Sequence, residues 1–150
     1  MVHVMTGEHV ASMNRAKDWI DQMLMQTHEA RLDALRKELK RQDLDGFVVP
    51  ISDEHVSEYV GAYAQRLAWL TAFTGSAGFS IITAEQAVVF VDGRYTLQVR
   101  EQIDLEHFQP GDLIGTPPHM WLSQNLQEGS VVGCDPWTLT VNEWNRFEKA

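Results

Sequence analysis

Apolar and polar residues follow one another along this chain in blocks that predict both strands and helices. Short apolar runs rich in Val, Ile and Phe predict buried strands at 47–49, 79–83, 87–91 and 131–134. Apolar residues recurring at helical spacing predict helices at 31–41, 66–73, 95–103, 116–129 and 140–147. Because the two patterns alternate, the sequence indicates a fold that combines helices with a sheet.

The stretch 66–100 organises the rest of this pattern. A glycine-rich segment at 75–78 interrupts a helix and leads into the first of two neighbouring apolar runs. The short polar segment 84–86 joins these runs, which predicts a hairpin of two buried strands. Asp92-Gly93 then turns the chain into a helix, and the predicted apolar face of this helix carries Tyr95, Val99 and Ile103.

Several residues predict where elements begin. Asp53 follows a strand and is expected to cap a short helix within 52–59. Thr116, which precedes two prolines, is expected to cap the helix that follows it. Thr140 and Glu143 have the spacing of a capping box, which predicts the start of the last helix.

Two segments give weaker signals. A short edge strand is expected at 106–109, before a proline and a glycine. Residues 1–27 stand apart, and a helix capped by Ser12 there would gather Ala16 and Ile20 on one face. We interpret 1–27 as a leader without stable structure or a marginal extra helix, with an arm that docks on a partner as the alternative.

Together these elements predict the fold class. Strands separated by helices favour an α/β fold with a mixed, mostly parallel sheet and helices on both faces. The hairpin at 79–91 would add the antiparallel pair. A length of 150 residues suits one domain, and a hydrophobic content of 44% can supply its core.

Composition and charge exclude some partners. The formal net charge is −9, and an acidic surface repels phosphate backbones and anionic lipids, so neither nucleic acid nor a membrane is expected as a partner. No apolar run approaches the ~20 residues of a membrane span, and no secretory signal is visible. Cys134 is the single cysteine and is expected to be a buried, unreactive thiol. These features fit the cytoplasm.

Groups for metal binding are sparse in the sequence. The histidines are widely scattered, and neither an HExxH helix nor a cysteine pair occurs. Asp53, His55 and Glu58 form the one acid–histidine cluster, with His55 and Glu58 spaced to share a helix face. The cluster is either a polar group aimed at a cleft or a helix cap with local pairing, and we favour the second interpretation.

Other candidates for catalysis also favour structural roles. Ser76 lacks the glycine two positions before it that a nucleophile elbow needs, so a turn is favoured. Asp92 and Asp135 follow predicted strands, where carboxylates of α/β active sites often lie. Each also precedes a turn residue, so both are expected to cap backbone N–H groups. Arg94 and Tyr95 are interpreted as a structural contact and a core ring.

Five strings of residues carry a family resemblance through their order and spacing. They are DEHVSEY at 53–59, RLAWL at 66–70, TGSAG at 74–78, FVDGRYTLQ at 90–98 and CDPW at 134–137. With them, about residues 30–150 resemble the N-terminal domain of the creatinase and Xaa-Pro aminopeptidase family of metallopeptidases. More narrowly, this region is similar to that domain in the three-domain aminopeptidase P proteins.

The resemblance implies a division of labour. In such enzymes a separate C-terminal domain holds two divalent metals, usually manganese, and removes the N-terminal residue from peptides with proline in second position. None of that domain's motifs is found here, so the chain is expected to comprise a leader (1–27) and a non-catalytic domain (28–150) of a longer cytoplasmic enzyme. The fold implied is the creatinase/prolidase N-terminal domain, with a ribonuclease-H-like motif.

The resemblance also suggests what this domain contributes. Related domains line the mouth of the catalytic site and help to form a homodimer, so the residues expected to face substrate are His55, Glu58, Tyr59 and Arg66. The alternative is a peptide- or protein-binding module from a creatinase-like protein that performs no hydrolysis. Metal ligands encoded beyond codon 150 would distinguish the two hypotheses.

Overall fold

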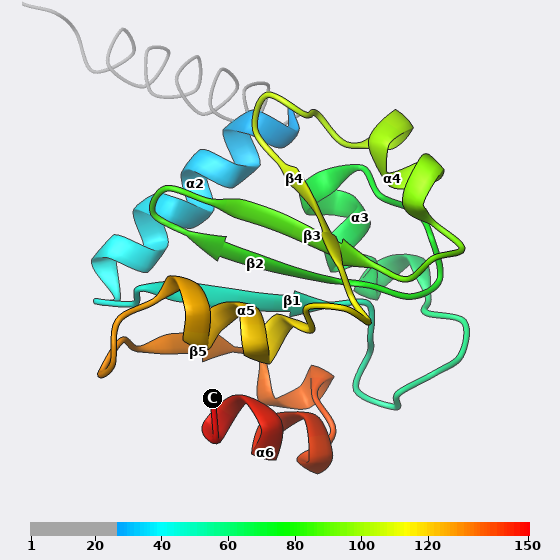
Figure 1. Cartoon of the computed structure of the whole chain (residues 1–150). Coiled ribbons are helices and arrows are strands. Elements are labelled where there is room, and N and C mark those ends of the chain that lie inside the picture. The colour runs from blue at the N-terminus through cyan, green and yellow to red at the C-terminus, as the bar shows by residue number, and fades with distance from the viewer. Residues whose placement is uncertain (1–26) are drawn as a thin grey trace, which may run out of the picture.

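A computed structural model describes residues 27–150 of the chain (Figure 1). The leader or extra helix expected at 1–27 lies outside the described residues, except for Thr27, which caps α2. The α-helices are α2 (His28–Arg41), α3 (Arg66–Thr71), α4 (Thr96–Gln102), α5 (Pro118–Asn125) and α6 (Val141–Glu148). The strands are β1 (Gly46–Pro50), β2 (Phe79–Thr83), β3 (Ala87–Val91), β4 (Gln109–Asp112) and β5 (Val132–Cys134). Short 3₁₀ turns form η1 (Ala62–Ala64) and η2 (Pro136–Thr138).

These strands form a five-stranded sheet in the order β4-β3-β2-β1-β5. β1 pairs in parallel with β5, and β3 pairs in parallel with β4. β2 is antiparallel to both of its neighbours. All the strands except β2 therefore run in one direction, which confirms the predicted mixed, mostly parallel sheet. The predicted hairpin is β2 and β3.

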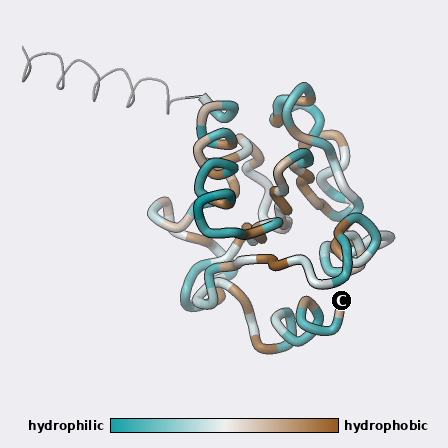
Figure 2. Tube along the Cα trace, turned by 90° about the vertical axis from the view of Figure 1, so that its left-hand side faces the viewer, coloured by the Kyte–Doolittle hydropathy of each residue, from teal (hydrophilic) through white to brown (hydrophobic). Residues whose placement is uncertain are grey.

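Helices cover both faces of this sheet, as predicted. On one face, Val49, Ile82 and Val89 from successive strands pack in a core cluster with residues of α2, α3 and α4. On the other face, Ile81 and Phe90 pack with residues of α5 and α6. Side chains of a strand point alternately to its two faces, which is why neighbouring residues of β2 belong to different clusters. In the side view of Figure 2 the most hydrophobic stretches lie between the helices.

The capping box predicted for the last helix is confirmed. The Thr140 hydroxyl accepts a hydrogen bond from the Glu143 backbone N–H, and the Glu143 carboxylate accepts one from the Thr140 backbone N–H. Both bonds satisfy donors that a helix start would otherwise leave unpaired. The sequence signal therefore located the start of α6 correctly.

The short helix expected within 52–59 is wrong, because this segment is an irregular loop. The Asp53 carboxylate accepts hydrogen bonds from the backbone N–H groups of His55 at 3.0 Å and Ser57 at 2.9 Å. Val56 has a φ of 54°, in the left-handed region, which a right-handed helix cannot contain. Asp53 thus caps a turn, and His55 and Glu58 do not share a helix face.

The boundaries of two further elements, β4 and α5, differ from the prediction. The edge strand expected at 106–109 is wrong in position, because residues 104–107 form a turn and β4 spans Gln109–Asp112. Pro110 is tolerated in β4 since an edge strand does not need every backbone N–H. Thr116 does not cap α5, which begins at Pro118 without a side-chain cap. The helix expected to end at Gly129 ends at Asn125.

Candidate functional site

The candidate site lies at one end of the sheet, where the parallel strands β1 and β5 have their C-terminal ends. This end is called the carboxyl edge of the sheet. β1 and β5 are parallel neighbours, so the loop that follows β1 and the η2 segment that follows β5 lie at the same edge. α3 begins at this edge as well, and its first residue is Arg66. Loops at the carboxyl ends of strands are the usual location of binding sites in α/β proteins.

Asp53 holds the loop after β1 in place. Its residue is only 3% exposed, and its carboxylate accepts the two backbone N–H bonds described above. These bonds favour the charged form, so the Ser57 backbone N–H, and then other hydrogen bonds, lower the pKa of the Asp53 carboxyl. An ionised Asp53 therefore keeps the neighbouring residues 54–59 exposed in one arrangement.

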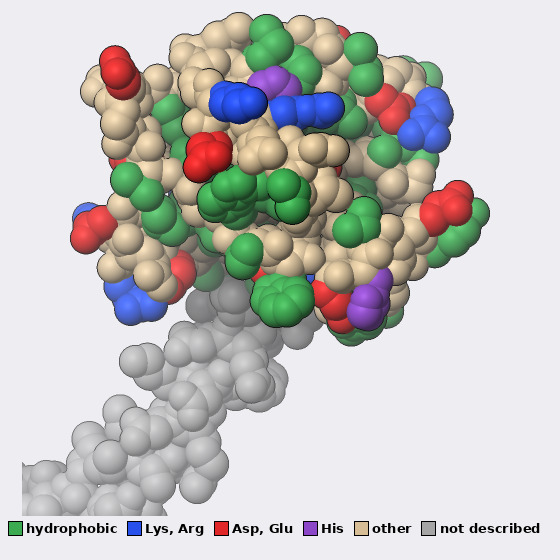
Figure 3. Space-filling model, turned by 90° about the horizontal axis from the view of Figure 1, so that it is seen from below, with side chains coloured by type: hydrophobic (Ala, Val, Ile, Leu, Met, Phe, Trp, Pro, Cys, Tyr) green, Lys and Arg blue, Asp and Glu red, His purple; other side chains and the backbone are tan. Residues whose placement is uncertain are grey.

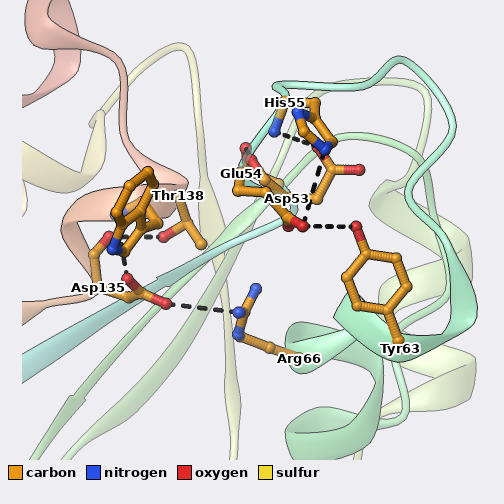
Figure 4. A network of polar contacts seen from close by, with 9 residues as sticks. Asp53, Glu54, His55, Tyr63, Arg66, Asp135 and Thr138 are labelled. Carbon is orange, nitrogen blue, oxygen red and sulfur yellow. Dashed lines mark hydrogen bonds and ion pairs between the residues drawn. The ribbon is translucent and has the colours of Figure 1, made fainter.

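Glu54 and His55 of this loop form a polar group with Tyr63 of η1 (Figure 4). The Tyr63 hydroxyl donates a hydrogen bond of 3.0 Å to Glu54 Oε1, and His55 Nε2 lies 3.8 Å from the same oxygen. The hydrogen bond to the Glu54 carboxylate raises the pKa of Tyr63. Hydrogen bonds from its own backbone N–H and from Tyr63 lower the pKa of Glu54.

An ion pair between Arg66 and Asp135 connects the start of α3 with the η2 segment. An Arg66 terminal nitrogen lies 3.4 Å from Asp135 Oδ2, while Asp135 Oδ1 accepts a hydrogen bond from the Trp137 backbone N–H. Figure 4 shows Arg66 between η2 and the loop that carries Asp53. The cap predicted for Asp135 is confirmed, and so is that for Asp92, whose carboxylate accepts the Arg94 backbone N–H.

Large side chains are exposed around these charges. Tyr59 is 84% exposed, Tyr63 is 70% exposed and Trp137 is 74% exposed. Seen from the side of α6 and the loop after β1, the surface carries hydrophobic side chains in separate groups beside acidic and basic ones (Figure 3). Exposed aromatic rings beside charged groups can contact a peptide through both its side chains and its termini.

The structure brings the predicted substrate-facing residues to one edge of the sheet but not into one cluster. His55, Glu58 and Tyr59 are exposed on the loop after β1, and Arg66 contacts Asp135 on the opposite side of the site. Sequence reasoning missed Tyr63 as the partner of Glu54 and Asp135 as the partner of Arg66. Glu54 and Tyr63 are nine residues apart in the irregular connection between β1 and α3, where no regular spacing signals a contact. Arg66 and Asp135 meet only because β1 pairs with β5.

Cys134 is half-buried on β5 and not fully buried as expected, because β5 is an edge strand. Burial, followed by the nearby Asp135 charge, raises the pKa of the Cys134 thiol, so the thiol form is favoured over the reactive thiolate. Among residues 27–150, no group of three or more His, Cys, Asp or Glu side chains is placed to hold a metal ion. In the same part of the chain, no helix is long and apolar enough to cross a membrane.

Comparison with known proteins identifies the family to which this domain belongs. The family model of the creatinase/prolidase N-terminal domain matches residues 31–150. The solved X-prolyl aminopeptidase of Caenorhabditis elegans, described as a cytosolic enzyme with a di-nuclear active site, superposes with a TM-score of 0.74. It is 28% identical in sequence, and the match covers 82% of this chain and 22% of that one. The chain belongs to the creatinase/prolidase N-terminal domain family.

Similar curated proteins narrow the family to aminopeptidases. Xaa-Pro aminopeptidase 2 of Homo sapiens is 36% identical over 119 residues, covering 79% of this chain. Aminopeptidase P1 of Arabidopsis thaliana is 39% identical over 109 residues, covering 71% of this chain. The chain spans 18% of the length of the human relative and 17% of that of the plant relative. It therefore corresponds to the N-terminal domain of Xaa-Pro aminopeptidases.

Proposed function

We propose that this chain is the non-catalytic N-terminal domain of a cytoplasmic metallo-aminopeptidase that removes the N-terminal residue from peptides with proline in second position. Its role is to shape the access of peptides to a catalytic domain elsewhere in the protein, and to contribute contacts to a homodimer. The observation that carries the proposal is the match of nearly the whole domain to Xaa-Pro aminopeptidases that are much longer than it.

The reacting groups would lie outside this domain. The C. elegans relative has a di-nuclear active site, whereas the residues described here contain no set of ligands suited to a metal ion. Two divalent metals, expected to be manganese, would therefore be held by the catalytic domain, and no step of the hydrolysis is assigned to the side chains of 27–150. The 150-residue chain mixed with manganese and an X-Pro peptide should show no turnover.

The residues proposed to face the peptide are His55, Glu58, Tyr59 and Arg66. Their exposure at the carboxyl edge of the sheet supports this role. His55 and Glu58 offer a donor and an acceptor for peptide backbone groups. The Tyr59 ring offers an apolar surface, and Arg66 offers a cation for a carboxylate.

The test uses the full-length enzyme with His55→Ala or Arg66→Ala. Each variant is expected to raise KM, or to shift the preferred peptide length, while kcat for the shortest X-Pro substrate changes little. The control is Arg100→Ala, which removes an exposed cation from α4. If both variants cleave a series of peptides of increasing length as the wild type does, the substrate-facing role is wrong.

A separate outcome bears on the alternative function. If the full-length protein lacks hydrolytic activity with every X-Pro peptide and divalent metal tried, the chain belongs to a binding module and not to an enzyme. The exposed aromatic side chains at the edge of the sheet would suit either function, so the hydrolysis assay decides between them.

A further inference from the structure

A small apolar pocket lies beside the candidate site, on the sheet face that α2 and α3 cover. It has a volume of about 280 Å³, and α2, α3, β1 and η2 form its walls. Its apolar lining includes Leu35, Phe47, Val49, Trp69 and Leu70. β5 is only three residues long, and the η2 segment that follows it, with its N-cap Asp135, contributes Asp135 and Thr138 to the pocket.

Three charged residues also line this pocket: the pair Arg66 and Asp135, and Arg31, whose guanidinium packs over the Trp69 ring. Neither side chain of the pair is buried, with 43% of Arg66 and 33% of Asp135 exposed, and their closest atoms are 3.4 Å apart. Within residues 27–150 the Arg66 guanidinium donates no hydrogen bond, so its N–H groups remain available to a ligand. Asp135 is fixed by the Trp137 N–H on one oxygen and directs the other at Arg66.

We propose that this pocket binds a free apolar α-amino acid as its zwitterion. The ligand carboxylate contacts Arg66, the ligand ammonium contacts Asp135, and the aliphatic side chain enters the apolar pocket. The carboxylate and ammonium of the ligand would form charge-assisted hydrogen bonds with Arg66 and Asp135 at the same time. An exposed ion pair contributes little by itself, so rearranging it around a ligand costs little.

Size and charge together select this class of ligand. Pockets for drug-sized ligands span roughly 300 to 1,000 Å³, so this one suits a single side chain and not a peptide. A purely apolar ligand would leave the charged mouth unused, and a simple anion would leave both Asp135 and the apolar walls uncompensated. The site takes free amino acids, and its occupancy does not depend on the role proposed for the loop after β1.

The test is an NMR titration of the ¹⁵N-labelled 150-residue chain with L-leucine. Shifts are expected at the amides of Leu35, Val49 and Leu70 and at the Trp69 indole. N-acetyl-L-leucine lacks the ammonium and L-leucinamide lacks the carboxylate, so each should bind about tenfold more weakly or worse. Glycine, which has no side chain, should not saturate the site.

Two substitutions separate the charged mouth from the apolar walls. Asp135→Asn keeps an oxygen that can accept the Trp137 N–H, but should weaken leucine binding about tenfold and abolish the preference over N-acetyl-L-leucine. Ala34→Leu places a larger side chain in the pocket wall and should abolish binding. Lys37→Leu, on an exposed position of the same helix, is the matched control and should bind leucine normally.

The proposal is overturned if leucine binds no better than its acetylated or amidated analogue. It is also overturned if Ala34→Leu binds leucine as the wild type does. A second pocket lies on the other face of the sheet, where Leu122 of α5, Val132 of β5 and Phe147 of α6 line it. Shifts confined to that pocket would be a third contrary result. Both proposals use Arg66, but their measurements differ: amino-acid binding is measured on this chain without hydrolysis, and the substrate-facing role is measured by peptide cleavage in the full-length enzyme. Failure of one measurement is therefore distinguishable from failure of the other.

Discussion

At the scale of single residues, two buried hydroxyl groups differ in how their burial is compensated. Ser80 is fully buried on β2, and its Oγ has no hydrogen-bond partner among the described residues. Thr71 is equally buried, but its hydroxyl donates to the Leu67 carbonyl and accepts from the Phe73 N–H. The two positions therefore offer a matched test of what a buried hydroxyl costs.

Ser80→Ala is expected to raise the free energy of unfolding by about 1 kcal/mol, because it removes an unpaired polar group. Thr71→Val keeps the shape of the side chain but removes both hydrogen bonds, and should lower the free energy of unfolding by about 1 to 3 kcal/mol. Urea denaturation at pH 7 measures both. A destabilised Ser80→Ala would show that the Ser80 hydroxyl has a partner.

The lowered pKa of Asp53 predicts that the stability of the fold depends on pH. Its pKa is lower in the folded chain than in the unfolded one, so its charge stabilises the fold at pH values above its ordinary pKa of about 3.9. This contribution is lost as the pH falls through the folded pKa. The stability difference between wild type and Asp53→Ala should therefore be full at pH 7 and shrink progressively below about pH 4.

Urea denaturation across pH 2.5 to 7 checks this, and Asp33→Ala is the control at an exposed position of α2. The difference between wild type and Asp33→Ala should not shrink in the way that the Asp53 difference does. A constant difference between wild type and Asp53→Ala over the whole range would mean that the ionised carboxylate does not hold the loop. The turn at residues 52–57 would then depend on other contacts.

Hydrogen bonds between residues close in the sequence could be predicted at this scale, whereas contacts between residues far apart in the sequence could not. Asp92 and Asp135 were correctly expected to cap backbone N–H groups, because the signal lies within a few residues of each. Asp53 was expected to cap a helix and instead caps a turn. The contact of Arg66 with Asp135 depends on the pairing of β1 with β5, which no local pattern encodes.

At the scale of elements, continuous apolar runs were the most reliable guide. β2 and β3 begin and end where the sequence predicted. β3 is an unbroken apolar run buried at every residue, and β2 is buried at all but its first residue and is apolar except at Ser80 and Thr83. The loop after β1 and the edge strand β4 were misplaced because both depend on Asp side chains that bind backbone N–H groups. Such bonds compete with helix and strand formation, and propensity alone does not decide between them.

Gly78, just before β2, lies very close to the backbone of β3. A Cβ built at Gly78 would lie 2.9 Å from the Phe90 carbonyl oxygen, a backbone atom that cannot move without shifting β3. Gly78→Ala should therefore lower the free energy of unfolding by about 1 to 3 kcal/mol. At Gly93 a Cβ meets nothing within 4 Å, so Gly93→Ala is the control and should be neutral or slightly stabilising.

Thermal and urea denaturation of the two variants measure this difference. Equal stabilities for Gly78→Ala and Gly93→Ala would mean that β2 can slide along β3 to admit the extra methyl group. Amide shifts of β3 residues distinguish the outcomes, because a shift of the strand would change the register in which Phe79 faces Phe90.

At the scale of the whole molecule, the fold class was predictable because alternating strand and helix patterns leave few ways to bury both faces of a sheet. The pocket beside Arg66 was not predictable, because its lining comes from α2, β1, α3 and η2, which are far apart in the sequence and meet only in the fold. The fold could be predicted from the apolar patterns of its helices and strands. The candidate site lies in the loop after β1 and in the η2 segment after β5, which carry no such pattern.

The net charge of −9 makes a last prediction at this scale. Mutual repulsion of like charges destabilises a compact chain, and salt screens it with a Debye length of about 10 Å at 0.1 M. The ion pairs seen here are mostly exposed and contribute little, so screening of the repulsion should dominate over screening of the pairs. Raising NaCl from about 0.01 to 0.3 M at pH 7 should therefore raise the melting temperature. Near the isoelectric point of about 5.0 the same change should have little effect, and a fall in melting temperature with salt at pH 7 would show that the ion pairs dominate.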